Sequence, residues 1–214
     1  MYNVAQKDNS DVVICDMCVH YKNGSKKQMN CTKFDSVYTV APSASNKIFK
    51  KTIIKDLLFI NGKWYEDFNF TTKVLLKNPK ISVISEPYYN YYIRDLSTMN
   101  NNNSLKNLDM IYIIDDLIDY AKKNNLYDDN VFKYLIFDHI LITSINRVAF
   151  HRNNDSKKVI SLLRKYCHDN LFNYKKFDFY KSVPIQRKIV ASLNYYGLHN
   201  ISKLLLITKA KIMK

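Results

Sequence analysis

Glycine and proline are scarce in this sequence. The 214 residues include only three glycines and four prolines. An all-β protein needs many tight turns, which these two residues favour, so their scarcity favours helices with a few strands. Hydrophobic residues make up 47% of the chain, which suffices for a buried core and excludes wholesale disorder. We therefore expect an α/β protein with one substantial domain, or one domain with an appendage.

Long apolar runs are also missing. A spanning helix needs about 18 or more apolar residues in succession, and no segment approaches that length. Residues 1–9 are polar, and the run Val12–Cys15 is far too short for the apolar region of a signal peptide. We expect a cytoplasmic protein, either soluble or peripheral on the inner face of the plasma membrane.

Cysteine is sparse, and its spacing invites a zinc or redox hypothesis. Cys15 and Cys18 form a CxxC pair, and His20 and Cys31 follow at short distance. No second CxxC or HxxxH closes a site, and these spacings match no common structural zinc pattern. We therefore expect these three cysteines and Cys167 to be reduced, partly buried thiols, as is usual in a cytosolic protein.

The charge is strongly positive. The formal net charge is +14 and the sequence pI about 9.5. Nucleic acid, an anionic membrane surface or a phosphorylated substrate would each suit such a balance. The lysines are scattered in pairs such as Lys26-Lys27 and Lys157-Lys158 and form no dense arm. Scattered charge argues against direct nucleic-acid binding.

The first hundred residues alternate between strand and helix signals. Asn23-Gly24 is a strong two-residue hairpin signal, and Ser43 to Asn46 supply capping residues for a short helix near Lys47–Leu57. The other elements expected in this part are a helix tail over Tyr2–Lys7, a strand over Asp11–Cys15, a turn at Asn61-Gly62, a helix over Phe68–Lys77 and a strand over Ile81–Ile84.

The sequence pattern changes after the run Asn100–Ser104, which is the clearest linker. Beyond it apolar residues recur with helical spacing, so we divide the chain into an α/β part, residues 1–100, and an all-helical part, residues 101–214. The predicted helices lie near residues 109–121, Val131–Phe150, Ser156–Cys167, Pro184–Tyr196 and Ile201–Met213.

Four blocks of residues carry a family resemblance through their order and spacing. They are Asp11–Asp16, Asn46–Lys50, Tyr65–Asp67 and Tyr91–Ser97. Together they resemble the C-terminal half of family 2 glycosyltransferases with the GT-A, Rossmann-like fold, which build capsular and other cell-surface polysaccharides. The resemblance covers roughly residues 1–100 and implies the acceptor side and lid of such a catalytic domain, followed by a helical region that fits the family only loosely.

The resemblance also implies roles for individual residues. Asp67 would be the catalytic base that takes the proton of the acceptor hydroxyl, giving inversion at the anomeric carbon. Glu66 would shape the acceptor site or hold Asp67, and Trp64 would pack against a sugar ring. Arg94 and Ser97 would contact the diphosphate from a flexible lid, because guanidinium groups match phosphate oxygens.

Each of these roles has a structural alternative. A Glu-Asp pair at a helix start also suits the positive end of the helix dipole. Arg94 beside Asp95 can form an ordinary surface ion pair. The tyrosines at 88, 89, 91 and 92 alternate on a strand, so one side of it can be core.

The family's metal site has no counterpart in this sequence. Members hold a divalent ion, Mg or Mn, through a DxD motif in their N-terminal half, and through the ion the nucleotide-sugar diphosphate. Asp8, Asp11 and Asp16 are not spaced as DxD, so we predict no metal ligand here. We expect a truncated inverting glycosyltransferase that transfers a sugar from a nucleotide-sugar donor to a cell-surface polysaccharide or lipid-linked acceptor. The alternatives are an inactive remnant, or a basic helical module that binds nucleic acid or a protein partner.

The C-terminal segment 203–214 mixes apolar residues with four lysines. That composition suits an interfacial helix on an anionic membrane. A terminal helix packed on its own domain fits equally well.

Overall fold

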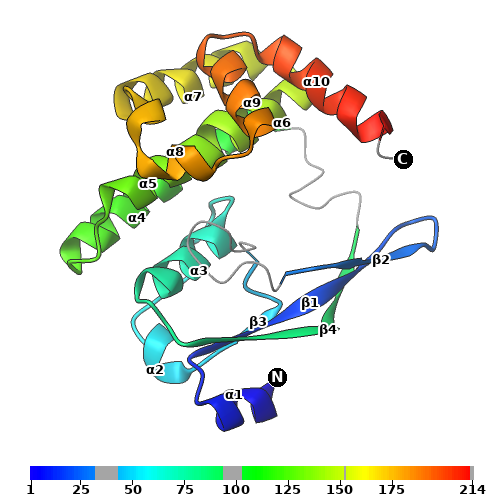
Figure 1. Ribbon diagram of the computed structural model, residues 1–214, viewed down its shortest axis with the longest axis vertical. Coiled ribbons are helices and arrows are strands. Elements are labelled where there is room, and N and C mark those ends of the chain that lie inside the picture. The colour runs from blue at the N-terminus through cyan, green and yellow to red at the C-terminus, as the bar shows by residue number, and fades with distance from the viewer. Residues whose placement is uncertain (32–42, 94–102, 152, 213–214) are drawn as a thin grey trace. The chain divides into compact units, whose positions relative to one another are not determined.

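The computed structural model describes residues 1–31, 43–93, 103–151 and 153–212, with side chains up to residue 208 (Figure 1). The chain divides into two compact units. We call residues 1–101 with 119–126 the sheet unit, and residues 102–118 with 127–214 the helical unit. The architecture is therefore mixed α/β, with far more helix than strand.

The sheet unit contains one small mixed sheet with β1 at its centre. Strands β2 and β3 pair antiparallel with its two halves, and β4 runs parallel to it over its whole length. Strands β2 and β3 therefore follow one another along one edge of β1, while β4 lies along the other. The elements are α1 Tyr2–Asp8, β1 Val12–His20, β2 Lys26–Met29, β3 Lys47–Phe49, α2 Lys51–Ile54, α3 Glu66–Leu76 and β4 Ile81–Tyr92.

Strand β1 is buried because both of its faces are covered. Val12 and Ile14 belong to one apolar cluster with Phe70 of α3. Val13 and Cys15 belong to a second cluster, against which residues of α1 pack. Alternate residues of a strand point to opposite faces, so the uninterrupted apolar run in β1 is the pattern of a strand covered on both sides.

The hairpin predicted from Asn23-Gly24 is present after β1, but its turn is longer than the two residues expected, because β1 ends at His20 and β2 begins at Lys26. The Tyr21 amide donates to the Ser25 carbonyl over 2.9 Å, and the Gly24 amide donates to the Tyr21 carbonyl over 3.0 Å. Gly24 has φ +80°, a conformation that glycine adopts without the steric cost of a Cβ. Strand β2 is exposed throughout, as its polar sequence requires.

Three predictions for this unit are wrong in extent. The strand expected over Asp11–Cys15 continues to His20 as β1. The helix expected over Lys47–Leu57 begins only at Lys51, because Lys47–Phe49 pair with Val12–Ile14 as β3. Edge pairing with β1 overrides the weak local preference for helix. Strand β4 continues eight residues past Ile84 to Tyr92, since β1 supplies partners beyond the Glu86-Pro87 interruption.

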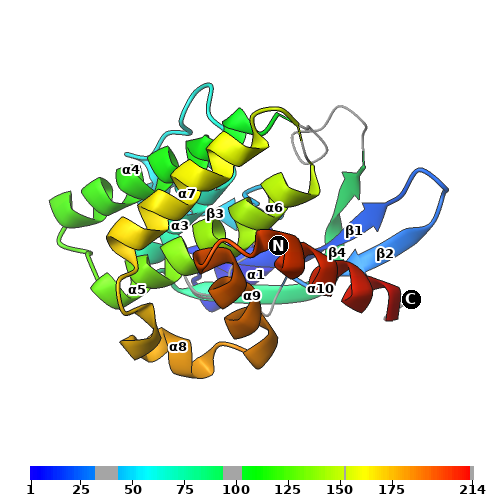
Figure 2. The ribbon, with the colours of Figure 1, turned by 90° about the horizontal axis from the view of Figure 1, so that it is seen from above.

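The helical unit is built around a run of three consecutive elements, α5 Asp129–Leu135, the π-helical segment η3 Ile136–Ser144 and α6 Ile145–Phe150. Phe132, Phe137 and Ile140 in this run are almost completely buried. Figure 2 shows α7 and α9 alongside it. The other elements are η2 Leu105–Leu108, α4 Asp109–Lys123, α7 Ser156–Asn170, η4 Tyr174–Lys176, α8 Asp178–Ser182, α9 Ile185–Tyr195 and α10 His199–Ile212.

The long helices predicted from periodicity are present in this unit. The helix expected near residues 109–121 is α4, and those expected at Ser156, Pro184 and Ile201 are α7, α9 and α10. The single helix expected over Val131–Phe150 contains a nine-residue π-helical interior. Within the described residues, each helix is too short or too polar to cross a bilayer.

Candidate functional site

The candidate site lies in the sheet unit, at the start of α3. A turn at Asn61-Gly62 leads into Trp64 and Tyr65, and α3 begins at Glu66. Glu66 and Asp67 occupy the first helical turn and are half-buried, and Phe68 is the first fully buried residue after them. The two carboxylates therefore sit at the positive end of the helix dipole, at the boundary between the apolar core and solvent.

Tyr65 enters this helix in a strained conformation. Its φ and ψ are 70° and 22°, in the left-handed region, and its side chain makes no capping hydrogen bond. An N-cap residue normally has extended backbone and a Ser, Thr, Asp or Asn side chain. A bulky residue in the left-handed region costs of order 1–3 kcal/mol, and such strain clusters at functional sites.

A buried lysine lies near Asp67. Lys47, the first residue of β3, is only 7% exposed. Its ammonium donates to the Asn46 side-chain oxygen over 2.9 Å and to the Ser43 carbonyl. Because a buried ammonium loses the hydration that stabilises its charge, these acceptors and the anionic groups around it are needed to hold it.

The electrostatics connect Lys47 to Asp67. Burial lowers the pKa of Lys47 from its ordinary 10.5 to about 8, and interactions with Cys31, Asp67 and Cys15 oppose that shift. Burial raises the pKa of both the Cys15 and Cys31 thiols above the usual value of 9.0. At neutral pH these thiols are uncharged, so Asp67 is the member of this group that supplies negative charge to Lys47.

A buried carboxylate marks the centre of the sheet. Asp16, 1% exposed, lies where the regular pairing of β1 with β4 is interrupted between Cys15 and Met17. It accepts hydrogen bonds from the Cys31 amide over 2.8 Å and from the Gln28 side chain over 2.9 Å. Such irregularities redirect side chains and are over-represented beside active sites.

Asn46 joins these elements. Its side-chain amide donates to the Cys15 carbonyl over 2.6 Å, and its own carbonyl accepts the Cys15 amide over 3.0 Å. The residues beside the middle of β1 are thus Asp16, Asn46 and Lys47, all buried and polar. Both Asn46-Lys47 and Asp16 belong to sequence blocks that carried the resemblance, although the sequence alone gave them no role.

The four cysteines are free thiols. Cys15 and Cys31 belong to different apolar clusters. No group of three or more His, Cys, Asp or Glu side chains that could hold a metal ion occurs in the ranges described above.

The predicted lid residues Arg94 and Ser97 lie outside the described residues. Of the tyrosines that precede them, Tyr89 and Tyr91 pack against the core cluster that contains Val12 and Phe70. Tyr92 is exposed and stacks on His20 with ring centroids 4.3 Å apart. The structure therefore divides this tyrosine-rich stretch between core and surface, as the alternation on a strand requires.

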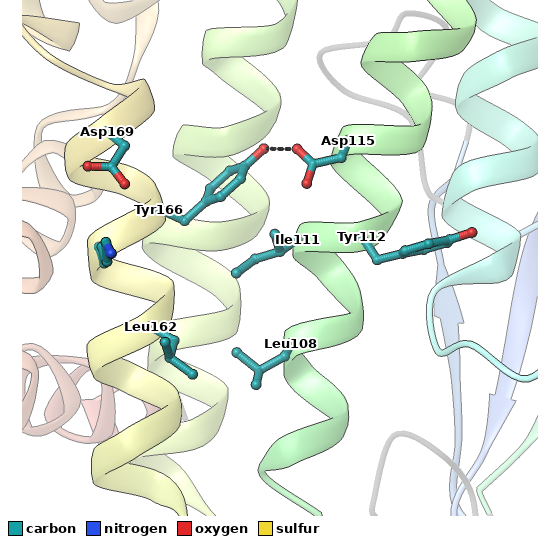
Figure 3. Close-up of a pocket in the computed structure, with 8 residues that line it drawn as sticks. Leu108, Ile111, Tyr112, Asp115, Leu162, Tyr166 and Asp169 are labelled. Atoms are coloured by element: carbon teal, nitrogen blue, oxygen red, sulfur yellow. Dashed lines mark hydrogen bonds between the residues drawn. The ribbon is translucent and has the colours of Figure 1, made fainter.

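A shallow pocket of about 450 Å³ lies within the helical unit, between η2–α4 and α7 (Figure 3). Leu108, Ile111 and Leu162 contribute its apolar part. Two of the polar groups that line it bond to each other: the Tyr166 hydroxyl donates to Asp115 over 2.6 Å. Burial and this hydrogen bond raise the pKa of Tyr166 above its ordinary value, so the phenol stays protonated. None of the predicted site residues lines this pocket.

A scan against protein-family models and a search of curated proteins found no match to this chain. The functional interpretation therefore rests on the residues of the site and on the resemblance of the four sequence blocks.

The site residues that sequence reasoning missed are Lys47 and Asp16. A lysine at the start of the apolar stretch Lys47–Phe49, and an aspartate at the end of the apolar stretch Val12–Cys15, are charges placed beside core segments. Charged groups are almost never fully buried unless paired. That position, beside a buried strand, is the signal that could have singled them out.

Proposed function

We propose that this chain forms the acceptor side of an inverting glycosyltransferase of the family 2 type, with a GT-A-like arrangement of its sheet unit. The observation that supports the proposal most directly is the convergence of separate sequence blocks. Lys47 comes from one block and Asp67 from another, and they interact beside the third, at the middle of β1. The strained backbone of Tyr65 at the same place is a second, independent mark of a functional site.

In the proposed reaction, Asp67 accepts the proton of an acceptor hydroxyl while the hydroxyl oxygen attacks the anomeric carbon of the donor sugar. The new carbon–oxygen bond forms as the bond to the nucleotide diphosphate breaks, and the diphosphate leaves with the bonding electrons. Attack from the face opposite the leaving group inverts the configuration. Asp67 in turn supplies negative charge to the buried Lys47 ammonium.

The remaining roles belong to the same proposal. Glu66, adjacent to Asp67 in the first turn of α3, positions the acceptor. Trp64, half-buried before that turn, provides an aromatic face for a sugar ring. Arg94 and Ser97 bind the donor diphosphate, a role that the resemblance alone implies. A lipid-linked acceptor would also require contact between this chain and a membrane surface.

The test is sugar transfer from a panel of nucleotide sugars, measured for this chain alone and for this chain joined to the nucleotide-binding half of a family 2 glycosyltransferase. We expect Asp67→Asn to lower the transfer rate by about 100-fold to 10,000-fold, the usual contribution of a general base. Asp129→Asn is the matched control, because Asp129 also lies in the first turn of a helix but outside the proposed site.

The outcomes separate the hypotheses. Full turnover in Asp67→Asn would contradict the assignment of the base. A similar loss in Asp129→Asn would show that the aspartates act on helix stability. Failure of the joined protein to transfer any sugar would favour an inactive remnant over an enzyme.

A further inference from the structure

The C-terminal helix leaves an apolar stripe uncovered. Helix α10 exposes Ile201, Leu204 and Leu205, and Leu198 is exposed immediately before the helix begins. Leu204 is 60% exposed. The spacings of three, four and seven residues place these side chains on one face of the helix. We call these four residues the α10 stripe.

The opposite face of α10 is fixed to the helical unit by polar contacts. The Ser202 hydroxyl donates to the Asn146 side chain over 2.8 Å. The Lys203 ammonium donates to the Ala149 carbonyl over 3.1 Å and lies 5.5 Å from the ring centre of Phe150. These contacts set the rotation of α10 within its unit. The stripe is therefore held on the outside of the unit rather than exposed by fraying.

The helices α6 and α9, which pack against α10, carry the basic residues Arg147, Arg187 and Lys188 and no acidic residue. Between residue 179 and residue 214 the sequence contains no aspartate or glutamate. Arg187 is paired with Asp138, and Lys203 is used within the unit as described above. Lys209, Lys211 and Lys214 follow the stripe in the sequence. An exposed apolar stripe on a helix whose neighbouring helices α6 and α9 contain cations and no carboxylates is complementary to a surface that is apolar inside and anionic outside.

We propose that the α10 stripe docks this protein on an anionic lipid surface, with α10 lying in the plane of the membrane interface and the basic C-terminal sequence attracted to the headgroups. A helix of 14 residues is about 21 Å long, shorter than the hydrocarbon core of about 30 Å. An exposed apolar face supplies insertion, and lysines supply attraction to anionic headgroups. The proposal uses only the helical unit and does not depend on the glycosyltransferase assignment.

The test is sedimentation of the full chain with lipid vesicles. Vesicles of phosphatidylcholine alone are compared with equimolar phosphatidylcholine and phosphatidylglycerol. We expect binding to the anionic vesicles that weakens as salt is added. The double variant Leu204→Ser with Leu205→Ser should lower the partition coefficient at least about tenfold, since two apolar side chains no longer insert. Lys209→Gln with Lys211→Gln should lower it roughly thirtyfold, at the usual contribution of a lysine near such a surface.

Phe172→Ser is the matched control. Phe172 is 76% exposed in the same unit but lies outside the stripe, so this variant should bind as the unchanged protein does. Because the leucines are exposed, circular dichroism should show the same fold in all variants. Equal binding of the leucine variant and the unchanged protein would overturn the proposal, as would equal binding to both kinds of vesicle. A dimer in sedimentation velocity that the leucine variant abolishes would assign the stripe to a second copy of the chain instead.

Discussion

The sheet unit and the helical unit bury different kinds of polar group. In the sheet unit the buried polar residues include two charged side chains, Asp16 and Lys47. Among the residues of the helical unit that the structure describes, Asp109 is the charged member of the buried set, and it pairs with Lys106 over 3.3 Å. The other buried polar side chains of this described part are the neutral residues Ser104, Asn107, Ser144, Asn146, Ser156, Asn194 and Ser202.

The neutral groups of the helical unit connect its helices. The Asn194 side chain donates to the Leu141 carbonyl over 2.8 Å, and the Ser202 hydroxyl donates to the Asn146 side chain over 2.8 Å. Neutral hydrogen bonds of this kind specify packing at little desolvation cost. Buried charges cost more. One of the two buried charged residues of the sheet unit, Lys47, interacts with Asp67 in the first turn of α3, which is the candidate site.

The same contrast holds for two helix starts. The Asp128 side chain accepts the Val131 amide over 3.2 Å, and the Asp128 backbone is extended, so α5 begins with an ordinary N-cap. Helix α3 begins with a left-handed tyrosine that offers no cap. The start of α5 thus follows the rules of local helix stability, and the start of α3 departs from them.

The largest expected effect would come from the core of the helical unit. Phe137 is fully buried and packs against Tyr174, Phe179 and Tyr180. Phe137→Ala should lower the free energy of unfolding by about 3–5 kcal/mol. Phe172→Ala, at an exposed position, should change it by less than about 0.5 kcal/mol. Denaturant unfolding measures both. Similar losses would show that packing does not account for the stability of this unit.

A second experiment tests the buried charge of the sheet unit, at Lys47, through the pH dependence of the free energy of unfolding. The pKa of Lys47 is about 8 when folded and 10.5 ordinarily. Between these values the unfolded chain binds a proton that the folded chain does not. The free energy of unfolding should therefore rise as pH increases from 8 to 10.5, and the penalty for the buried charge is fully present below pH 8.

The comparison for that experiment is Lys47→Met, which keeps much of the side-chain volume and removes the titrating group. Subtracting the variant's pH profile from that of the unchanged protein removes contributions shared by both, such as that of Tyr127, whose pKa burial raises to about 12. We expect a difference of a few kcal/mol between the ends of the window. A flat difference profile would contradict a buried, destabilised ammonium at Lys47.

The smallest effect concerns Tyr65. Tyr65→Gly and Tyr65→Ala remove the same ring, but glycine alone tolerates the left-handed conformation without a Cβ penalty. The glycine variant should be more stable than the alanine variant by about 1–2 kcal/mol. Thermal or denaturant unfolding of the pair tests this. Equal stability would show that the helix start relaxes freely and is not strained.

Local patterns in the sequence predicted most of the helical unit correctly. Apolar residues recur along α4, α7 and α9 with the spacing of a helix that buries one face, and this spacing needs no knowledge of the partner. The hairpin at Asn23-Gly24 is equally local, since the turn residues themselves favour it. Strand β3 was missed because its three residues are fixed by pairing with β1, which lies more than thirty residues earlier in the chain.

The candidate site divides in the same way. The sequence by itself determined the covalent neighbours Trp64, Glu66 and Asp67, the helix that follows them and the positive charge of the chain. Only the tertiary structure decided that Lys47 is buried and interacts with Asp67, and that Asp16 lies at an interruption in the sheet. Burial and charge–charge interaction depend on which segments meet in space, and neither is encoded in the spacing of residues along the chain.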